Sequence, residues 1–388
     1  MLSSFMVAGA AIGSGVLALP ILAAGPGLIN TLIFIILTFI LSYFMAIVSI
    51  DVYAHYDNHN VNAATLARDY FGKPGYILTV LLNVLSMGAL AAAYVNAGGD
   101  LLVKIVLPIF HIKLTPQLGM IIFFVVFMPA FTLGLGFISR LNGVIFTTKF
   151  TLLSLGILLG LKLINPSIFE FMPAEIKYLG AGASTMFCIW FMHMVLPLIL
   201  RINDWNPAKA KQAVLIGLII PALAYSGWLL LIFSLVSRQE FLRLDTIGDI
   251  MHFALTKPGV PTLIATLVGG FAAITVLTAF LSVGFALIAF VIDALKWHEG
   301  PKSRALATLV SFAIPVVIAL MFPKAFVFIY QQSNIFQLGS AMIPVAAAYV
   351  YKQKHARSVL PEIIMLGLTL LIILSQILDD FSVFPNYH

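Results

Sequence analysis

Long apolar runs recur along the whole of this 388-residue chain, and they constrain its fold more than any other feature. Each run has roughly 18 or more residues with few charges, which is enough for a helix to span a bilayer. Hydrophobic residues make up 61% of the chain and charged residues only 9%. Backbone groups within lipid find no water, so apolar spanning segments must be helices. The sequence therefore predicts an all-α polytopic membrane protein embedded in a lipid bilayer.

The apolar runs predict about eleven transmembrane helices in one transmembrane domain that comprises residues 1–388. The predicted spans are 4–24, 28–54, 77–103, 118–138, 142–163, 179–202, 211–236, 260–295, 304–322, 325–351 and 359–379. The polar stretches between them are short, so no separate soluble domain is expected. The single cysteine, Cys188, excludes a disulfide within the chain.

The distribution of basic residues predicts the orientation in the membrane. Lysine and arginine favour cytoplasmic loops. With the N-terminus in the cytoplasm, the predicted cytoplasmic loops hold twelve of them and the outer loops eight. The bias is clearest in the loop with Lys352, Lys354 and Arg357. Eleven spans then place the C-terminus on the opposite, outer side of the membrane. Because the net charge of +6 is spread over loops, it does not indicate nucleic-acid binding.

The stretch GAAIGSGVLALP, residues 9–20, combines several helix-weakening residues inside the first span. A backbone within lipid leaves the helical form only where protein or a watery cavity satisfies it, and secondary transporters use such broken helices to bind charged groups. We therefore expect unwinding near Ala11–Gly15, with the amides of Gly13, Ser14 and Gly15 directed at a carboxylate. The alternative is close helix packing through small residues.

A second unusual span lies five spans later, at STMFCIWFMHMVLP, residues 184–197. It contains His193, and an ionisable group within a membrane marks a functional candidate. A separation of five spans makes the first and sixth helices cross in opposite directions, as in an inverted repeat of five plus five helices. The repeats would comprise residues 4–163 and 179–351, with an extra helix at 359–379. The alternatives are a structural histidine and plain packing of Trp190.

Several segments resemble the hydroxy/aromatic amino acid permeases, the bacterial tyrosine and tryptophan transporters. These segments are AGAAIGSGVLALP (8–20), AAYVNAGGDLL (92–102), His193 with Pro197, NPAKAKQAVLIGLIIP (206–221), VLTAFLSVGFALIAFVIDAL (276–295) and FPKAFVFIYQQSNIFQLGSAMIP (322–344). The resemblance covers nearly the whole chain. It implies the leucine-transporter fold with helices 1 and 6 broken, proton symport and an aromatic amino acid substrate.

This chain departs from the family pattern at two places. The family's sixth-helix break reads Ser-Phe-Gly-Phe-His, whereas residues 189–193 here are Ile-Trp-Phe-Met-His. The eighth helix has Thr278 followed by Ala279 where the family often has Thr-Ser. Since an alanine side chain offers no oxygen to sodium, the second departure favours protons as the coupling ion.

Lys149 lies about seven residues into the span 142–163, roughly 10 Å along a helix. The resemblance implies that its ammonium occupies the place of sodium near Thr278. The alternative is a lysine that extends its charge to the membrane interface. Asp51, Asp100 and Asp293 fall near span ends, where interfacial or capping charges are expected.

These patterns predict a secondary active transporter that imports an aromatic amino acid, tyrosine or tryptophan, by proton symport and alternating access. The predicted substrate-binding residues are Ala10, Ala11, Gly13, Ser14, Gly15, Tyr94, Phe187, Cys188, Trp190 and His193, and the predicted ion-coupling residues are Lys149 and Thr278. The alternatives are sodium-coupled or exchange transport of other neutral amino acids and, less well supported, a channel or sensor. No catalytic constellation, metal-ligand set or cofactor motif is present, and the oligomeric state stays open.

Overall fold

The structure is a computed structural model that describes residues 2–13, 15–56, 61–132, 135–164, 175–241, 243–244, 246–298 and 300–382. Within these ranges the chain is helical and contains no β-strand. It divides into two compact units. The first comprises Met1–Leu85, Pro173–Ser226 and Asn334–Tyr387, and the second comprises Ser86–Met172 and Gly227–Ser333 together with His388.

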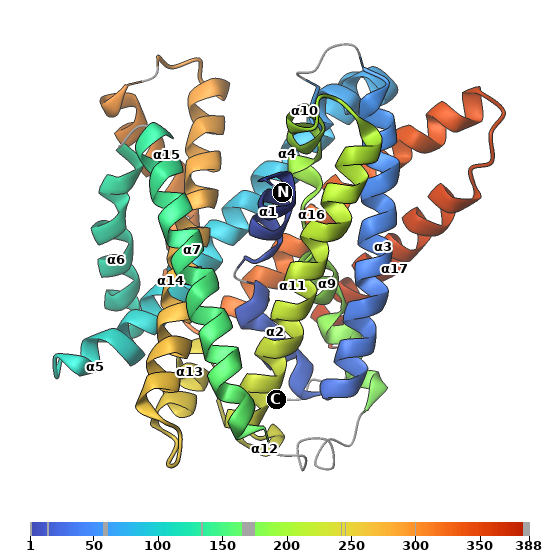
Figure 1. The fold of residues 1–388 in the computed structure, drawn as a ribbon. Helices are drawn as coiled ribbons and strands as arrows, with labels where there is room; N and C mark the ends of the chain where they lie inside the picture. Colours follow the sequence, from blue (N-terminus) through green and yellow to red (C-terminus); the bar gives the residue numbers. More distant parts are fainter. Residues whose placement is uncertain are drawn as a thin grey trace. The chain divides into compact units, whose positions relative to one another are not determined.

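Three helices contribute to both units, namely α4 (Ala63–Leu101), α11 (Pro207–Leu235) and α16 (Phe326–Lys354) (Figure 1). The first unit also contains α1 (Leu2–Ala11), α2 (Gly15–Ala24), α3 (Leu28–Ala54), α9 (Leu179–Cys188), α10 (Leu196–Ile202) and α17 (Leu360–Asp380). The second unit also contains α5 (Leu107–Ile109), α6 (Pro116–Phe127), α7 (Leu135–Gly160), α12 (Arg238–Phe241), α13 (Ile247–Thr256), α14 (Thr262–Ala294) and α15 (Pro301–Met321).

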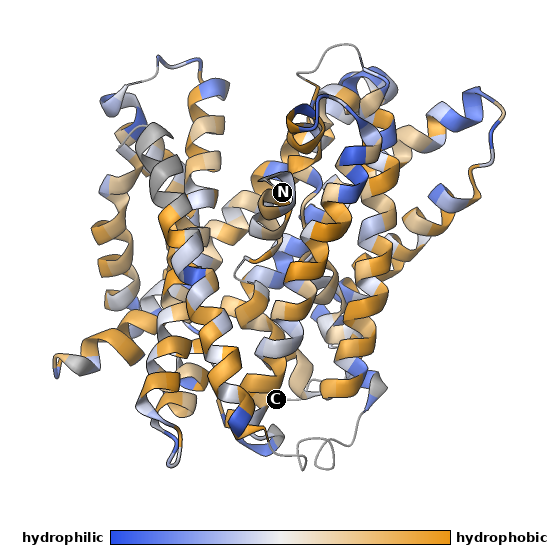
Figure 2. Cartoon of the chain, in the orientation of Figure 1, coloured by the Kyte–Doolittle hydropathy of each residue, from blue (hydrophilic) through white to orange (hydrophobic). Residues whose placement is uncertain are grey.

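Seven helical segments of the described chain are long and apolar enough to cross a membrane, and α1 with α2 adds an eighth as one bent span. The seven are Leu28–Ala54, Ala63–Val106, Leu179–Ile202, Pro207–Leu235, Thr262–Asp293, Pro301–Met321 and Leu360–Asp380. Hydrophobic residues dominate along these helices, and hydrophilic residues gather at the loops (Figure 2). Each of the eleven predicted spans contains helix, but the count of eleven itself stays a prediction.

In the first unit, α9 packs against α2, α3 and α17. The buried core that joins α3, α9, α16 and α17 consists of Met45, Phe187, Cys188, Leu338, Ala341, Val345 and Met365. Helix α11 approaches α1 closely, because a Cβ atom at Gly217 would lie only 2.5 Å from the Cβ of Val7. The ends of α1 and α9 are therefore packed against other helices, the condition under which a membrane helix can be interrupted.

In the second unit, α7 and α14 pack side by side in opposite directions. A Cβ atom at Gly156 of α7 would lie 4.0 Å from Val268 of α14, and one at Gly270 would lie 3.5 Å from Leu152. Residue numbers therefore rise along one helix as they fall along the other. This register fixes which residues of the two helices lie at the same level.

The end of α4 holds α13 through a charged cluster in the second unit. The Asp100 carboxylate accepts a hydrogen bond of 2.7 Å from the backbone N–H of Gly248, in the first turn of α13. Lys104 lies 2.9 Å from Asp100 and 2.8 Å from Asp249. A carboxylate at a helix N-terminus compensates the helix dipole. Asp100 is therefore a capping charge, as its place at a span end indicated.

Candidate substrate site

The first predicted helix break is present. Helix α1 ends at Ala11 and α2 begins at Gly15, with a bend of 50° between their axes. The N–H of Gly13 donates to the carbonyl of Ala11 at 2.6 Å, a tight turn in place of the helical pattern. Ala10 is exposed and Gly13 is partly exposed, whereas Ala11 and Gly15 are buried. The break is therefore accessible at Ala10 and Gly13. Ser14 lies outside the described residues.

The second break, which the sequence predicts near Phe187–Phe191, is also present, and its irregular backbone begins two residues later, at Ile189. Helix α9 continues to Cys188, and Ile189–Met192 are irregular before a short 3₁₀ turn at His193–Val195. The helical hydrogen bond from Ile189 N–H to the Thr185 carbonyl, at 3.0 Å, preserves the last turn. The carbonyls of Phe187 and Cys188 each accept one backbone hydrogen bond, from Trp190 and Phe191. Each carbonyl retains a second lone pair.

Tyr225 of α11 connects the two breaks. Its phenolic oxygen lies 2.6 Å from the carbonyl oxygen of Ala11 and 3.0 Å from that of Ile189. The side chain is fully buried. Because a phenol has one proton, the two carbonyl oxygens share the hydroxyl proton of Tyr225, and the Ala11 carbonyl also accepts from the Gly13 N–H. The breaks are therefore adjacent within the first unit, and their carbonyls can still accept from a ligand.

Trp190 is held in place by three neighbours. Its indole N–H donates to the Thr38 hydroxyl at 3.0 Å, and its ring packs edge-on against Phe39 and Tyr225 at 5.5 and 5.4 Å. The Thr38 hydroxyl also lies 3.0 Å from the carbonyl of Met186 in α9. Trp190 has no exposed surface, so its side chain is held in place within the second break.

Polar side chains from α16 and α17 hold the last turns of α9. The Asn334 amide donates to the hydroxyl of Thr185 at 2.8 Å and lies 3.3 Å from that of Ser184. Ser184 in turn donates to the Gln376 amide oxygen at 2.5 Å. All four side chains are buried. Hydrogen bonds between buried polar side chains hold membrane helices together, and here they orient the end of α9.

His193 follows directly on the second break and is 5% exposed. Neither ring nitrogen has a hydrogen-bond partner among the described residues. The ring packs edge-on against Phe191, with 6.0 Å between the centroids. Buried polar groups are normally paired, so an imidazole in this state is suited to bind a polar group of a ligand.

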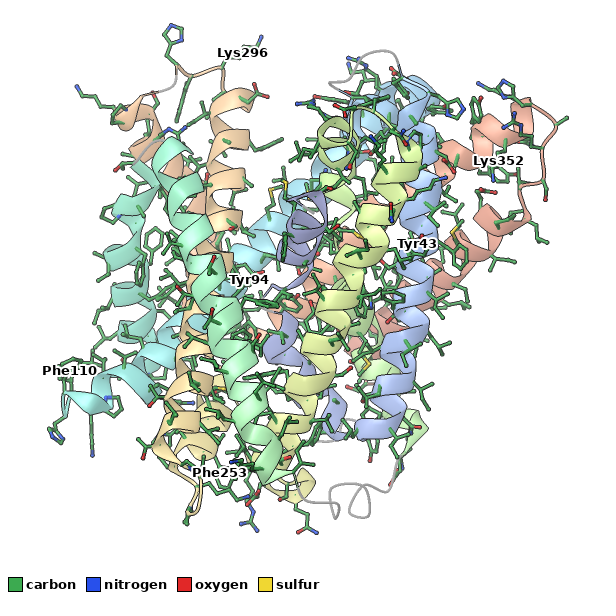
Figure 3. The ribbon with its side chains drawn as sticks, viewed as in Figure 1. Tyr43, Tyr94, Phe110, Phe253, Lys296 and Lys352 are labelled. Atoms are coloured by element: carbon green, nitrogen blue, oxygen red, sulfur yellow. The ribbon has the colours of Figure 1, made fainter. Side chains whose placement is uncertain are left out.

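The predicted site residues therefore fall into two groups. Within the first unit the structure brings Ala11, Gly13 and Gly15 together with the segment that contains Phe187, Cys188, Trp190 and His193. Tyr94 is buried in α4 within the second unit (Figure 3).

Lys149 and Thr278 also belong to the second unit. The Thr278 hydroxyl donates within its own helix, to the carbonyls of Ile274 and Thr275. Lys149 is 5% exposed and lies two turns before Gly156, whereas Thr275 lies two turns after Val268. The antiparallel register therefore brings Lys149 level with Thr275. The hydroxyl of Thr275 is buried and has no partner among the described residues.

Sequence reasoning missed Thr38, Tyr225 and Asn334. Each is a polar residue in a span, which is itself a signal, because a buried hydroxyl or amide needs a partner. The partners are far away in the sequence: 148 residues for Thr38–Met186, 149 for Asn334–Thr185 and 214 for Tyr225–Ala11. No local pattern could identify them.

Sequence comparison matches this chain to known proteins over most of its length. Residues 1–378 match the tryptophan/tyrosine permease family. "Tyrosine-specific transport system 1" of Haemophilus influenzae is 30% identical over 383 residues, covering 96% of this chain and 93% of that protein. "Tyrosine-specific transport system 2" of the same organism is 26% identical over 329 residues, covering 84% and 81%.

Among solved structures, a manganese transporter of Eremococcus coleocola superposes with a TM-score of 0.61 at 13% identity, covering 98% of this chain and 85% of that chain. At this identity the similarity shows the fold, which is that of leucine-transporter-like membrane transporters. The chain is therefore a multi-pass membrane transport protein, not an enzyme, and it belongs to the tryptophan/tyrosine permease family.

Proposed function

We propose that this protein imports an aromatic amino acid, tyrosine or tryptophan, by proton symport with alternating access. The observation that carries the proposal is the pair of adjacent helix breaks whose carbonyls share the single proton of Tyr225. Two tyrosine-specific relatives support the aromatic substrate.

Charge matching at the breaks assigns the two ends of the amino acid. The substrate carboxylate meets the backbone N–H groups at the start of α2, near Gly13–Gly15, where the helix dipole is positive. The ammonium meets carbonyl oxygens at the ends of α1 and α9, among Ala10, Ala11 and Phe187–Ile189. Three ammonium N–H groups can satisfy acceptors that Tyr225 alone satisfies only in part.

The aromatic side chain of the substrate lies beside the second break. His193 bonds the phenol hydroxyl of tyrosine or the indole N–H of tryptophan, and Trp190 supports the wall behind it. A site that bonds a substrate hydroxyl rejects analogues without it much more strongly than an apolar pocket does.

Proton coupling rests on the ammonium of Lys149 at the level of Thr275. A buried cation there supplies the positive charge that sodium supplies in metal-coupled transporters, and Ala279 offers no side-chain oxygen to a metal. Sodium-coupled or exchange transport of other neutral amino acids is the alternative.

The test is uptake into proteoliposomes that contain the purified protein. We expect tyrosine or tryptophan to accumulate under an imposed proton gradient in sodium-free buffer. Glutamine and leucine at equal concentration serve as competitors. Accumulation that requires a sodium gradient at equal pH would contradict proton coupling, and equal competition by leucine would contradict an aromatic substrate. A conductance far above carrier turnover would indicate a channel.

A further inference from the structure

A groove of about 800 Å³ lies on the first unit between α3, α9 and α17. Phe44 and Val48 of α3 line one side, and Ile364 and Leu368 of α17 line the other. Ala183 and Gly180 of α9 lie between them, and their small size leaves the groove open. Ile364 and Leu368 are 51% and 44% exposed, so the groove opens sideways from the unit.

The lining of this groove excludes a polar occupant. Its two hydroxyl-bearing residues, Thr38 and Ser375, already donate to backbone carbonyls, Ser375 to Ile372 at 2.8 Å. The remaining lining is apolar. A groove of this kind in a membrane protein takes a hydrocarbon chain, since burial of each methylene is favourable and no polar group is left to solvate.

One end of the groove is positively charged. Leu360 and Pro361 line it and follow directly on the loop between α16 and α17. Lys354 and Arg357 are exposed there, and in the described part of the chain neither forms an ion pair. The loop is fixed by Lys352, at the end of α16, which lies 2.6 Å from the buried carboxylate of Glu362 in α17 (Figure 3).

We propose that this groove binds an anionic phospholipid, with acyl chains between α3 and α17 and its phosphate headgroup on Lys354 and Arg357. Charge complementarity selects the headgroup, because basic residues at a membrane surface attract anionic lipids. The lipid would also support the candidate substrate site. Thr38 lines the groove and holds Trp190 and the Met186 carbonyl, just before the second break.

Lipid titration of the purified protein tests this proposal by native mass spectrometry. The lipids are phosphatidylglycerol and phosphatidylcholine with identical acyl chains. We expect the wild type to bind phosphatidylglycerol more tightly. The double substitution Lys354→Gln with Arg357→Gln should weaken phosphatidylglycerol binding about tenfold or more and leave phosphatidylcholine unchanged. The matched control is Lys296→Gln with Lys302→Gln, an exposed lysine after α14 and one in the first turn of α15. This control should change the binding of neither lipid.

The proposed position of the acyl chains, between α3 and α17, is tested by filling the groove with a larger side chain. Leu368→Trp should weaken the binding of both lipids, because the indole occupies the space between α3 and α17. Leu370→Trp is its control, since Leu370 lies on the same helix, is 53% exposed and does not line the groove. Equal binding of the two lipids by the wild type would overturn the proposal. The proposal would also be overturned if Leu370→Trp lost as much lipid binding as Leu368→Trp. The same holds if the Lys296/Lys302 variant lost as much as the Lys354/Arg357 variant.

Discussion

The hydroxyl of Tyr225 lies between two carbonyl oxygens that belong to different helix breaks. Removing it by Tyr225→Phe leaves the Ile189 carbonyl without a donor, at a cost of about 1–3 kcal/mol. The Ala11 carbonyl then keeps only its hydrogen bond from the Gly13 N–H. We expect lower thermal stability and weaker substrate binding. Tyr43→Phe is the control, because Tyr43 of α3 makes no hydrogen bond among the described contacts (Figure 3). Equal unfolding temperatures of both variants would show that the link contributes nothing.

His193 provides a residue-level test of substrate choice. In His193→Phe the ring remains but its hydrogen-bonding nitrogens are lost, so the preference for tyrosine over phenylalanine should fall by at least about tenfold. His193→Gln retains a donor and an acceptor and should keep part of the preference. Competition of each amino acid against labelled tyrosine measures the ratio. An unchanged ratio in His193→Phe would place this side chain away from the substrate hydroxyl.

At the scale of elements, a substitution in the break between α1 and α2 should affect substrate binding without affecting folding. A Cβ atom at Gly13 would meet no atom closer than the Ala11 carbonyl oxygen at 3.9 Å, so the fold accommodates a side chain there. Gly13→Val should therefore express and fold normally but abolish uptake, because the methyl groups block the approach of a carboxylate. Gly217→Ala should instead lower expression and thermal stability, since its Cβ would clash with Val7 in α1. Uptake at the wild-type rate in Gly13→Val would remove Gly13 from the site.

Helix α3 offers a matched pair of buried threonines. Thr38→Val leaves the buried indole N–H of Trp190 without an acceptor and should destabilise the protein by about 1–3 kcal/mol. Thr31→Val should be nearly neutral, because the Thr31 hydroxyl is buried and has no partner among the described residues. Thermal unfolding with tryptophan fluorescence as the signal compares the two. A loss of stability in Thr31→Val as large as in Thr38→Val would refute the role assigned to Thr38.

At the scale of the whole molecule, the proposed proton coupling rests on one buried charge of the second unit, the ammonium of Lys149. Lys149→Met keeps a long apolar side chain and removes the buried ammonium. We expect the variant to fold, bind substrate and lose accumulation driven by a proton gradient, while exchange of internal for external substrate persists. The exposed Lys162 of the same segment supplies the control, Lys162→Met, which should accumulate normally. Proton-driven accumulation by Lys149→Met would assign coupling elsewhere.

The sequence by itself determined that the protein lies in a lipid bilayer, that it is helical and where approximately the two breaks occur. Long apolar runs admit only helices in a bilayer, and the glycines of residues 9–15 weaken a helix locally, so both are properties of short segments. The resemblance of ordered motifs also identified the family, which the match over residues 1–378 confirms.

Tertiary structure decided which polar groups meet. The second break begins at Ile189 instead of Phe187 because α9 is held by Thr38, Asn334 and Gln376 from three other helices. Tyr225 reaches both breaks, and the register of α7 on α14 brings Lys149 level with Thr275. Hydrogen bonds and helix register between segments far apart in the chain depend on packing, which no local sequence pattern encodes.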